Sequence, residues 1–211
     1  MKPYYEEDGI TIYCADCRDV LPMLPKVDLV LTDPPYGIGY ASDPLPVMRK
    51  EGRVVNHVAA SWDETTVDEV PFIATLGTTA IIWGGNYYPL PPSRGWLCWN
   101  KPDSPPSMAD FELGWTNRDT ISAMFSWSIA ATNAERVGHP TQKPLALMKW
   151  CIEWSKTNGT ILDPFMGSGT TLVAAKKLDR KCIGIEINEK YCEIAARRLQ
   201  DTTPSLFREE Q

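Results

Sequence analysis

The sequence predicts an α/β fold in a single domain, and three observations support this prediction. With 211 residues, 43% of them hydrophobic, the chain can bury one substantial core without needing a second domain. Strand-like apolar runs alternate with helix-like segments at both ends of the chain, as in parallel crossover units. The run Val27–Leu31 stops abruptly at an acid, two prolines and an aromatic ring, so it resembles a strand that presents polar groups at its carboxyl end.

The first segments form one such crossover unit. Residues 10–14 alternate and are rich in β-branched and aromatic side chains, which predicts a strand. A short helix over 18–24 and a second strand over 27–33 complete the unit. Residues 37–62 show no usable period and are interrupted by prolines and glycines. We expect a long mobile loop there, and loops of this length are commonly functional.

The middle of the chain changes character. A helix over 65–76, starting at a pair of threonines, and a buried strand over 79–85 continue the alternation. Three further strands then follow without intervening helices, which favours antiparallel pairing at one end of the sheet. These strands are predicted over 96–100, 111–116 and 121–128.

The last third alternates again. A proline suits the first turn of a helix over 144–156, and a strand over 160–163 leads into a glycine-rich turn. A helix over 171–178, a strand over 181–187 and a helix over 189–199 complete the predicted fold. The polar tail over 201–211 is expected to fray.

The composition and the cysteine spacing indicate the cellular location of the protein and the state of its thiols. No run approaches the ~18–20 apolar residues needed to span a bilayer, and the start of the chain is polar, so we expect a cytoplasmic protein without membrane contact. Six irregularly spaced cysteines indicate reduced thiols. Cys14 and Cys17 form a Cys-x-x-Cys pair, but no second pair or nearby histidine supplies the other ligands of a zinc site. We therefore expect core packing and no metal.

The formal charge of −6 argues weakly against a nucleic-acid partner, but its distribution matters more. Arg49, Lys50 and Arg53 lie close together with a single acid, Glu51, among them. They could form a local positive surface on an acidic body. An ordinary solvated loop is the alternative.

The turn after the second strand reads Asp33-Pro34-Pro35-Tyr36. Consecutive prolines fix φ and lack amide hydrogens, so they hold the neighbouring carbonyls in one rigid turn. Asp33 and the Pro34 carbonyl then become convergent acceptors, and Tyr36 offers a flat face for stacking. On its own, the motif could equally be an ordinary turn at the end of a strand.

A glycine-rich turn from Asp163 to Thr170 precedes a helix and brings backbone amides close to a ligand. It lacks the lysine of a phosphate-binding loop and the third glycine of the dinucleotide fingerprint. Glu186, 17 residues after Gly169, could accept both hydroxyls of a ribose, so a nucleoside cofactor is favoured over a phosphate. A solvated acid at the strand end is the alternative for Glu186.

The segment His139–Pro144, of sequence HPTQKP, opens the helix over 144–156. It can be read as an elaborate helix start, with Thr141 as the cap. It can also be read as a site where Thr141 and Lys143 hold a carboxylate. The segment alone leaves both interpretations open.

Taken together, the DPPY, HPTQKP, DPFMGSGT and GIEINEKY segments resemble, in this order, the β-class of S-adenosylmethionine-dependent DNA amino-methyltransferases. The resemblance runs from about Ile10 to Leu199. It implies a Rossmann-like methyltransferase fold in which the catalytic motif precedes the cofactor motif, a permuted order. It also implies a mostly parallel seven-stranded sheet with a terminal antiparallel hairpin.

The resemblance also implies roles for individual residues. Asp33, Pro34, Pro35 and Tyr36 would form the methyl-transfer site. The resemblance gives no role to Arg49, Lys50 and Arg53; our own hypothesis is that these residues, on the loop beside the site, contact DNA phosphates. The expected S-adenosylmethionine site comprises Asp16, Cys17, Asp33, Thr141, Lys143, Asp163, Phe165, Gly167, Ser168, Gly169, Thr170 and Glu186.

The implied reaction is methyl transfer to the exocyclic N6 amine of an adenine flipped out of double-stranded DNA. Asp in the DPPY motif resembles adenine-N6 enzymes, and cytosine-N4 transfer is the alternative. A non-catalytic cofactor-binding or DNA-binding subunit with the same fold is a further alternative. The chain departs from many family members in being small, with little room between Phe111 and His139 for a separate target-recognition domain. Sequence specificity would then come from short loops or from a partner subunit, such as a second copy of the chain in a homodimer, or it would be relaxed.

Overall fold

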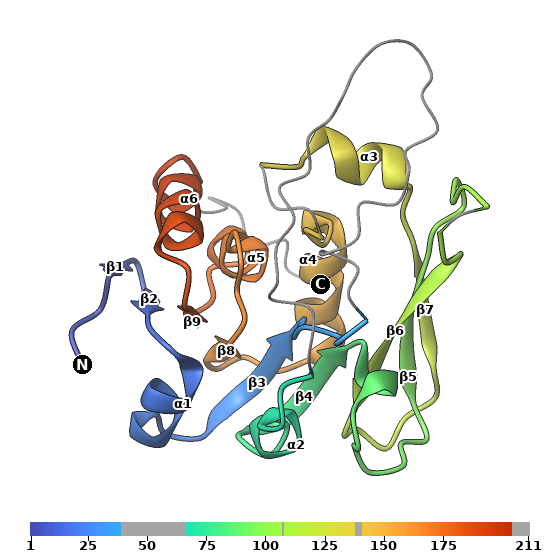
Figure 1. The fold of residues 1–211 in the computed structure, drawn as a ribbon, viewed down its shortest axis with the longest axis horizontal. Coiled ribbons are helices and arrows are strands. Elements are labelled where there is room, and N and C mark those ends of the chain that lie inside the picture. Colours follow the sequence, from blue (N-terminus) through green and yellow to red (C-terminus); the bar gives the residue numbers. More distant parts are fainter. Residues whose placement is uncertain (39–65, 107, 138–140, 204–211) are drawn as a thin grey trace.

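The computed structural model describes residues 1–38, 66–106, 108–137 and 141–203, which form helices packed on both faces of one sheet (Figure 1). The strands run in the order β1-β2-β9-β8-β3-β4-β6-β5-β7. Their bounds are β1 Tyr5–Glu7, β2 Ile10–Cys14, β3 Val27–Thr32, β4 Gly77–Trp83, β5 Trp96–Asn100, β6 Phe111–Thr116, β7 Ala123–Ser126, β8 Ile161–Asp163 and β9 Cys182–Glu186. The α-helices are α1 Cys17–Val20, α2 Val70–Ile73, α3 Ile129–Ala134, α4 Leu145–Ser155, α5 Thr170–Lys177 and α6 Glu189–Gln200, and 3₁₀ turns lie at Leu21–Met23 and Gly85–Tyr87.

The centre of the sheet is parallel. From β2 through β9, β8 and β3 to β4, each neighbouring pair is parallel. Antiparallel pairing begins on both sides of this block, where β1 pairs with β2 and β6 pairs with β4 and β5. The predicted α/β class and the antiparallel β5–β6 pair are therefore confirmed.

Two details of the predicted sheet were wrong. The sheet has nine strands rather than seven, because the short polar segment β1 adds to one edge and β7 adds to the other. Strand β7 also runs parallel to β5, not antiparallel. It can do so because β6 lies between β4 and β5, so the chain returns from β6 to the free side of β5.

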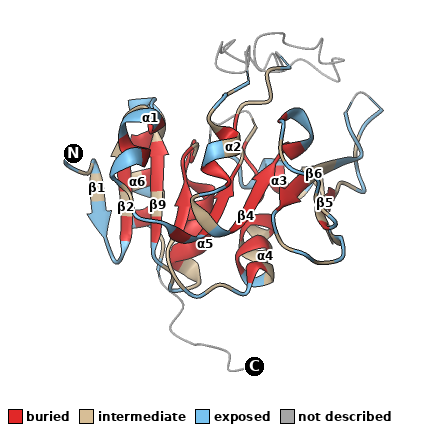
Figure 2. Cartoon of the chain, turned by 90° about the horizontal axis from the view of Figure 1, so that it is seen from below, coloured by how far each residue is buried: buried red, intermediate tan, exposed pale blue. Residues whose placement is uncertain are grey.

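Helices α4, α5 and α6 cover one face of the sheet, and α1 and α2 cover the other (Figure 1). Two hydrophobic cores correspond to these layers. Leu147, Ile152 and Leu172 belong to the first core, whereas Val20 and Ile73 belong to the second. Figure 2 shows the result, with buried central strands and an exposed β1. Burying both faces of the parallel strands explains why they read as continuous apolar runs.

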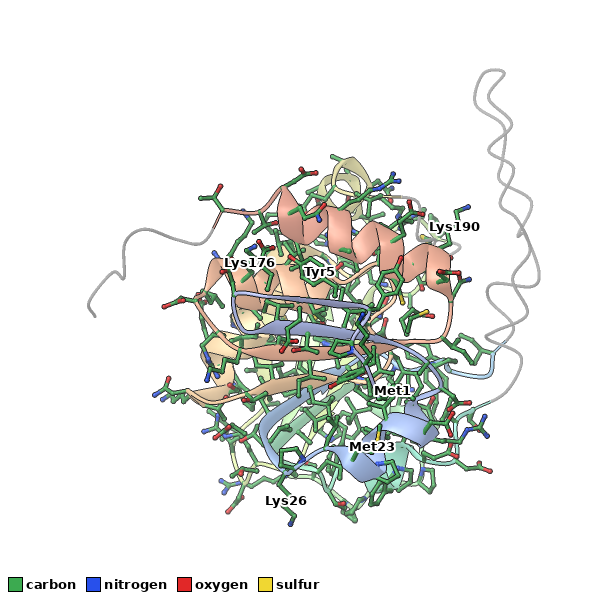
Figure 3. The ribbon with its side chains drawn as sticks, turned by 90° about the vertical axis from the view of Figure 1, so that its left-hand side faces the viewer. Met1, Tyr5, Met23, Lys26, Lys176 and Lys190 are labelled. Carbon is green, nitrogen blue, oxygen red and sulfur yellow. The ribbon has the colours of Figure 1, made fainter. Side chains whose placement is uncertain are left out.

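The edge formed by β1 is held by one buried lysine (Figure 3). Lys176 of α5 is only 6% exposed. Its Nζ donates to the Leu199 carbonyl at 3.1 Å and lies 3.2 Å from Asp8 Oδ2 in the β1–β2 turn. This contact ties the N-terminal hairpin to the last two helices.

The helices differ from the predictions in two places. The helix expected over 65–76 is confined to Val70–Ile73 within the described residues. Helix α3 was not predicted; it begins where the Ser128 hydroxyl accepts from the Ala131 amide at 3.0 Å. Its few residues carry no clear amphipathic period. Among the described residues, no helix is both long and apolar enough to cross a bilayer.

Candidate active site at the carboxyl edge of the sheet

The predicted site residues follow strands that end at one edge of the sheet. Strands β2, β9, β8 and β3 are parallel neighbours, so their carboxyl ends lie side by side. Cys14 pairs with Glu186, and Asp163 pairs with Gly184. Asp33 follows the last residue of β3 directly.

A cavity of about 360 Å³ opens at this edge. It is lined by four of the predicted cofactor residues, Asp16, Cys17, Phe165 and Glu186. The chain segment before α2, residues 66–69, closes the opposite side. The volume falls within the ~300–1,000 Å³ usual for small-molecule sites.

Glu186 is anchored by backbone amides. Its Oε2 accepts from Gly167 N at 3.1 Å, and its Oε1 accepts from Asn188 N at 2.8 Å. Burial raises the pKa of Glu186, and these amide bonds oppose that shift. A carboxylate oxygen has a second lone pair, so both oxygens can still accept from a bound ligand.

The glycine turn approaches α6 closely. Gly169 has φ of +79°, and a Cβ there would lie 2.7 Å from Ala195 Cβ. Arg198 of α6 holds the turn in place, since its guanidinium donates to the Ser168 carbonyl at 2.6 Å and to Thr170 Oγ1 at 3.2 Å. Ser168 and Thr170 are buried by these contacts and support the turn from behind.

Asp163 lies buried beneath the same turn. Its Oδ1 accepts from Thr32 Oγ1 at 2.7 Å and from Phe165 N at 3.2 Å. Burial raises its pKa to about 6, although these hydrogen bonds favour the charged form. Asp163 therefore links β3 to the glycine turn, and its burial destabilises the ionised form of its carboxyl group.

This shift predicts a pH-dependent stability difference between the wild type and Asp163→Asn. A carboxyl whose folded pKa is raised stabilises the fold below its unfolded value near 4, and this contribution is lost as the pH rises through 6. The free energy of unfolding of the wild type, relative to the variant, should fall by about 2 kcal/mol between pH 4 and pH 7. Urea titrations across this range measure it. Asp201→Asn, at an exposed position, is the control. A pH-independent difference for Asp163→Asn would contradict this assignment.

The Asp33 turn forms a second cluster beside the cavity. Asp33 Oδ1 accepts from the Tyr36 hydroxyl at 2.6 Å, and Oδ2 accepts from Lys143 Nζ at 2.5 Å. Lys143 Nζ also lies 3.1 Å from the Tyr36 oxygen. Burial raises the pKa of Asp33; the charge of Glu112 adds to this effect and that of Lys143 opposes it.

Residues 84–88, after β4, clamp the turn from the neighbouring strand. The Tyr87 ring stacks on Tyr36 with centroids 4.9 Å apart, and the Tyr88 hydroxyl donates to the Pro35 carbonyl. Gly84 has φ of +66°, and a Cβ at this position would overlap the Tyr36 ring. The Tyr36 ring therefore requires a glycine at position 84.

A charged network extends from Asp33 into β6. Glu112 lies between two ammonium groups, with Oε1 2.5 Å from Lys101 Nζ and Oε2 3.0 Å from Lys143 Nζ. Burial alone would raise the pKa of Glu112, but the two lysines outweigh it and hold the value at about 2. Burial would likewise lower the pKa of Lys143, yet Asp33 and Glu112 together raise it. Glu112 and Lys143 are therefore both ionised at neutral pH.

The comparisons with known proteins agree with this arrangement. A family model described as DNA methylase, for N6 and N4 methyltransferases, matches residues 99–197. The type II methyltransferase M.ScaI of Streptomyces caespitosus is 28% identical over 271 residues, covering 98% of this chain and 86% of that protein. M.HinfI of Haemophilus influenzae is 28% identical over 253 residues, covering 92% of this chain and 69% of that protein.

The family model and these relatives support membership of the N6/N4 DNA amino-methyltransferase family. Solved structures show the same fold. The M1.HpyAVI–SAM complex superimposes with a TM-score of 0.61 at 24% identity, covering 90% of this chain and 99% of that one. PvuII DNA methyltransferase, titled cytosine-N4-specific, superimposes with a TM-score of 0.55 at 16% identity, covering 96% of both chains.

The structure brings several predicted site residues into two groups, which adjoin where Tyr36 pairs with Thr66 of the cavity wall. Asp16, Cys17, Phe165 and Glu186 line the cavity, whereas Lys143 is in the Asp33 cluster. Thr141 is partly buried, in the segment that precedes α4. A contact of Thr141 or Lys143 with the cofactor stays a prediction. In the ranges that the structure covers, no three acidic, histidine or cysteine side chains form a metal site.

Other predictions fall on residues without a structural description. Arg49, Lys50 and Arg53, together with most of the loop over 37–62, lie outside the described residues, and so does most of the tail over 201–211. Their expected roles stay predictions.

Several site residues were not found from the sequence. Glu112 is an acid in an otherwise apolar strand, and Gly84 ends a strand, so both left a signal. Arg198 and Tyr87 left none, because their contacts depend on segments far away in the chain. These residues contact the predicted site residues and hold them in position.

Proposed function

We propose that this chain is a site-specific DNA methyltransferase that uses S-adenosylmethionine and modifies the N6 amine of an adenine. The observation that carries the proposal is that the Asp33 turn adjoins the cavity lined by Phe165 and Glu186, because Tyr36 pairs with Thr66 of the cavity wall. The first offers acceptors for an amine, and the second suits a nucleoside. Two relatives that are type II methyltransferases support this assignment.

The cavity residues fit S-adenosylmethionine. Glu186 keeps free acceptor positions for the two ribose hydroxyls, and the Phe165 ring lines the wall where an adenine could stack. Asp16, which caps α1 by accepting from Arg18 N at 2.9 Å, lies at the same wall. When bound, the cofactor supplies an already activated methyl group as a sulfonium, so no metal or covalent enzyme intermediate is needed.

The Asp33 turn would activate the amine. The lone pair of an exocyclic amine is delocalised into the base ring, which makes the nitrogen a poor nucleophile. Acceptors for its two hydrogens, the Asp33 carboxylate and the Pro34 carbonyl, draw the nitrogen toward tetrahedral geometry and free the lone pair. The rigid Pro34-Pro35 turn holds both acceptors in place before the substrate arrives. The amine held by these two acceptors would take the methyl group that bound S-adenosylmethionine supplies, with the thioether as leaving group, and would then lose one proton.

The amine is inaccessible inside a duplex, so the base has to leave the stack. Tyr36 remains our candidate for stacking with the flipped base, and the stacked Tyr87 ring holds the Tyr36 ring in place. Arg49, Lys50 and Arg53 remain our candidates for phosphate contacts.

Adenine is favoured over cytosine because the turn begins with Asp33, and the family's cytosine-N4 enzymes more often carry serine there. Cytosine-N4 transfer remains the second candidate, since a cytosine-N4-specific enzyme shares the fold. A non-catalytic subunit is disfavoured because the chain keeps Asp33 and Tyr36, in contact with Lys143, beside a cavity lined by Phe165 and Glu186.

Replacing Glu186 with glutamine is expected to weaken S-adenosylmethionine binding about 10- to 100-fold. The substitution removes the charge that strengthens hydrogen bonds from the ribose, each worth about 1.5–3 kcal/mol. Isothermal titration calorimetry measures the change. Glu189→Gln, an exposed acid three residues further along, should bind as the wild type does. Equal affinity of Glu186→Gln and the wild type would remove Glu186 from the ribose site.

Modification-sensitive sequencing of DNA from cells that express the chain tests the proposed function. We expect N6-methyladenine at one recurring sequence. N4-methylcytosine at such a sequence would instead establish the second candidate. Unmodified DNA, from cells in which the folded protein is present, would support the non-catalytic reading.

A further inference from the structure

Four charged side chains of alternating sign link β6 to the Asp33 turn. The order is Lys101, Glu112, Lys143 and Asp33, and successive groups are 2.5, 3.0 and 2.5 Å apart. They come from the residue after β5, from β6, from the segment before α4 and from the turn after β3. The chain of charges is therefore built by the fold and not by one local motif.

Lys143 is the shared member of this chain. Its side chain is only 7% exposed, so its ammonium group depends on these carboxylates rather than on water. With only one carboxylate nearby, the ammonium group would interact almost entirely with that carboxylate. Glu112 Oε2, 3.0 Å away, gives the ammonium a second negatively charged partner, so that the ammonium interacts with two carboxylates.

This division matters for Asp33. A carboxylate fully engaged by one ammonium group has less negative charge to offer another N–H donor. We infer that Glu112 is a positioning residue for the methyl-transfer site, which draws Lys143 partly away from Asp33 so that the carboxylate remains a strong acceptor for the base amine. The inference rests on the proposed function.

A purely structural ion pair across the sheet is the competing explanation. Buried ion pairs are weak stabilisers, because the cost of removing the charges from water offsets most of their attraction. One carboxylate would also satisfy Lys143, yet two converge on it. The second carboxylate is better explained by its effect on the first.

The charged groups around Asp33 determine whether a substitution raises or lowers the pKa of its carboxyl group. Glu112 raises the pKa of Asp33, whereas Lys143 lowers it. Lys101 acts through Glu112. In the part of the chain that the structure describes, the titratable or charged groups around Asp33 include Tyr36, Tyr87, Tyr88, Lys101, Glu112, Lys143 and Asp163.

Two substitutions with opposite expected shifts test the inference. Glu112→Gln leaves Lys143 to Asp33 alone, so the pKa of Asp33 falls and the acid limb of the kcat/KM profile should move to lower pH. Lys101→Met leaves Glu112 to Lys143 alone, so the acid limb should move to higher pH. For Glu112→Gln we also expect kcat to fall about 10-fold, with S-adenosylmethionine affinity within about two-fold of the wild type.

The assay is methyl transfer to unmethylated DNA from pH 4.5 to 8, with thermal melting to confirm that each variant is folded. Opposite shifts of the acid limb support the inference, because a merely structural role would slow both variants without moving it. Shifts in the same direction, or no shift, overturn it. If the folded wild type transfers no methyl group, the proposed function fails, which is a separate result.

Discussion

Asp33→Ala is expected to lower the rate of methyl transfer to DNA by about 10²- to 10³-fold, the usual effect of removing one group that stabilises charge in a transition state. The substitution deletes the acceptor that Tyr36 and Lys143 hold at 2.6 and 2.5 Å. Affinity for S-adenosylmethionine should stay within a few-fold of the wild type, because the cavity is lined by other residues. Single-turnover transfer of labelled methyl groups, together with calorimetry, measures both quantities.

Two further variants make this result specific. Asp33→Asn keeps the size of the side chain and one acceptor oxygen, so it should retain more activity than alanine. Asp110→Ala, at an exposed acid just before β6, should transfer methyl groups as the wild type does. If Asp33→Ala lowered the affinity for S-adenosylmethionine as strongly as the rate of methyl transfer, Asp33 would be needed for cofactor binding and not for activation of the amine.

Gly84→Ala is expected to lower methyl transfer about 10²-fold. The new Cβ would overlap the Tyr36 ring, and φ of +66° is strained for any residue with a Cβ. Because Tyr36 also binds Asp33, a displacement of the ring moves the proposed catalytic carboxylate. A misplacement of about 1 Å can cost that factor in rate. Single-turnover kinetics measures it.

The matched control is another glycine on a neighbouring strand. A Cβ at Gly114 would lie at ordinary contact distance, 3.5 Å from its nearest neighbours, so Gly114→Ala should keep nearly full activity. Full activity of Gly84→Ala, with unchanged melting temperature, would mean that the Tyr36 ring is free to move without consequence.

The elements that were predicted correctly are marked by short sequence patterns within the element itself. Strand β3 and its turn are marked by an apolar run that ends in two prolines. The β8–α5 turn is marked by glycines at 167 and 169, both of which have positive φ. Parallel pairing then places Asp33, Asp163 and Glu186 at one edge, which follows from strand order without further information.

Contacts between distant segments explain what could not be predicted. Lys143 and Asp33 are 110 residues apart in the chain, and Arg198 reaches a turn 30 residues away. No periodicity encodes such pairs. The same limit applies to β7, whose parallel pairing with β5 depends on β6 lying between β4 and β5. The signal from Glu112 was visible as an acid in an apolar strand, but its two partners were not.

Nucleoside analysis of DNA incubated with the purified wild type and methyl-labelled S-adenosylmethionine tests the central proposal most directly. We predict that the label appears as N6-methyladenine and that Asp33→Ala lowers its yield about 10²-fold or more. Label on a ring carbon of any base, or wild-type yield from folded Asp33→Ala, would contradict transfer to an amine held by the Asp33 turn.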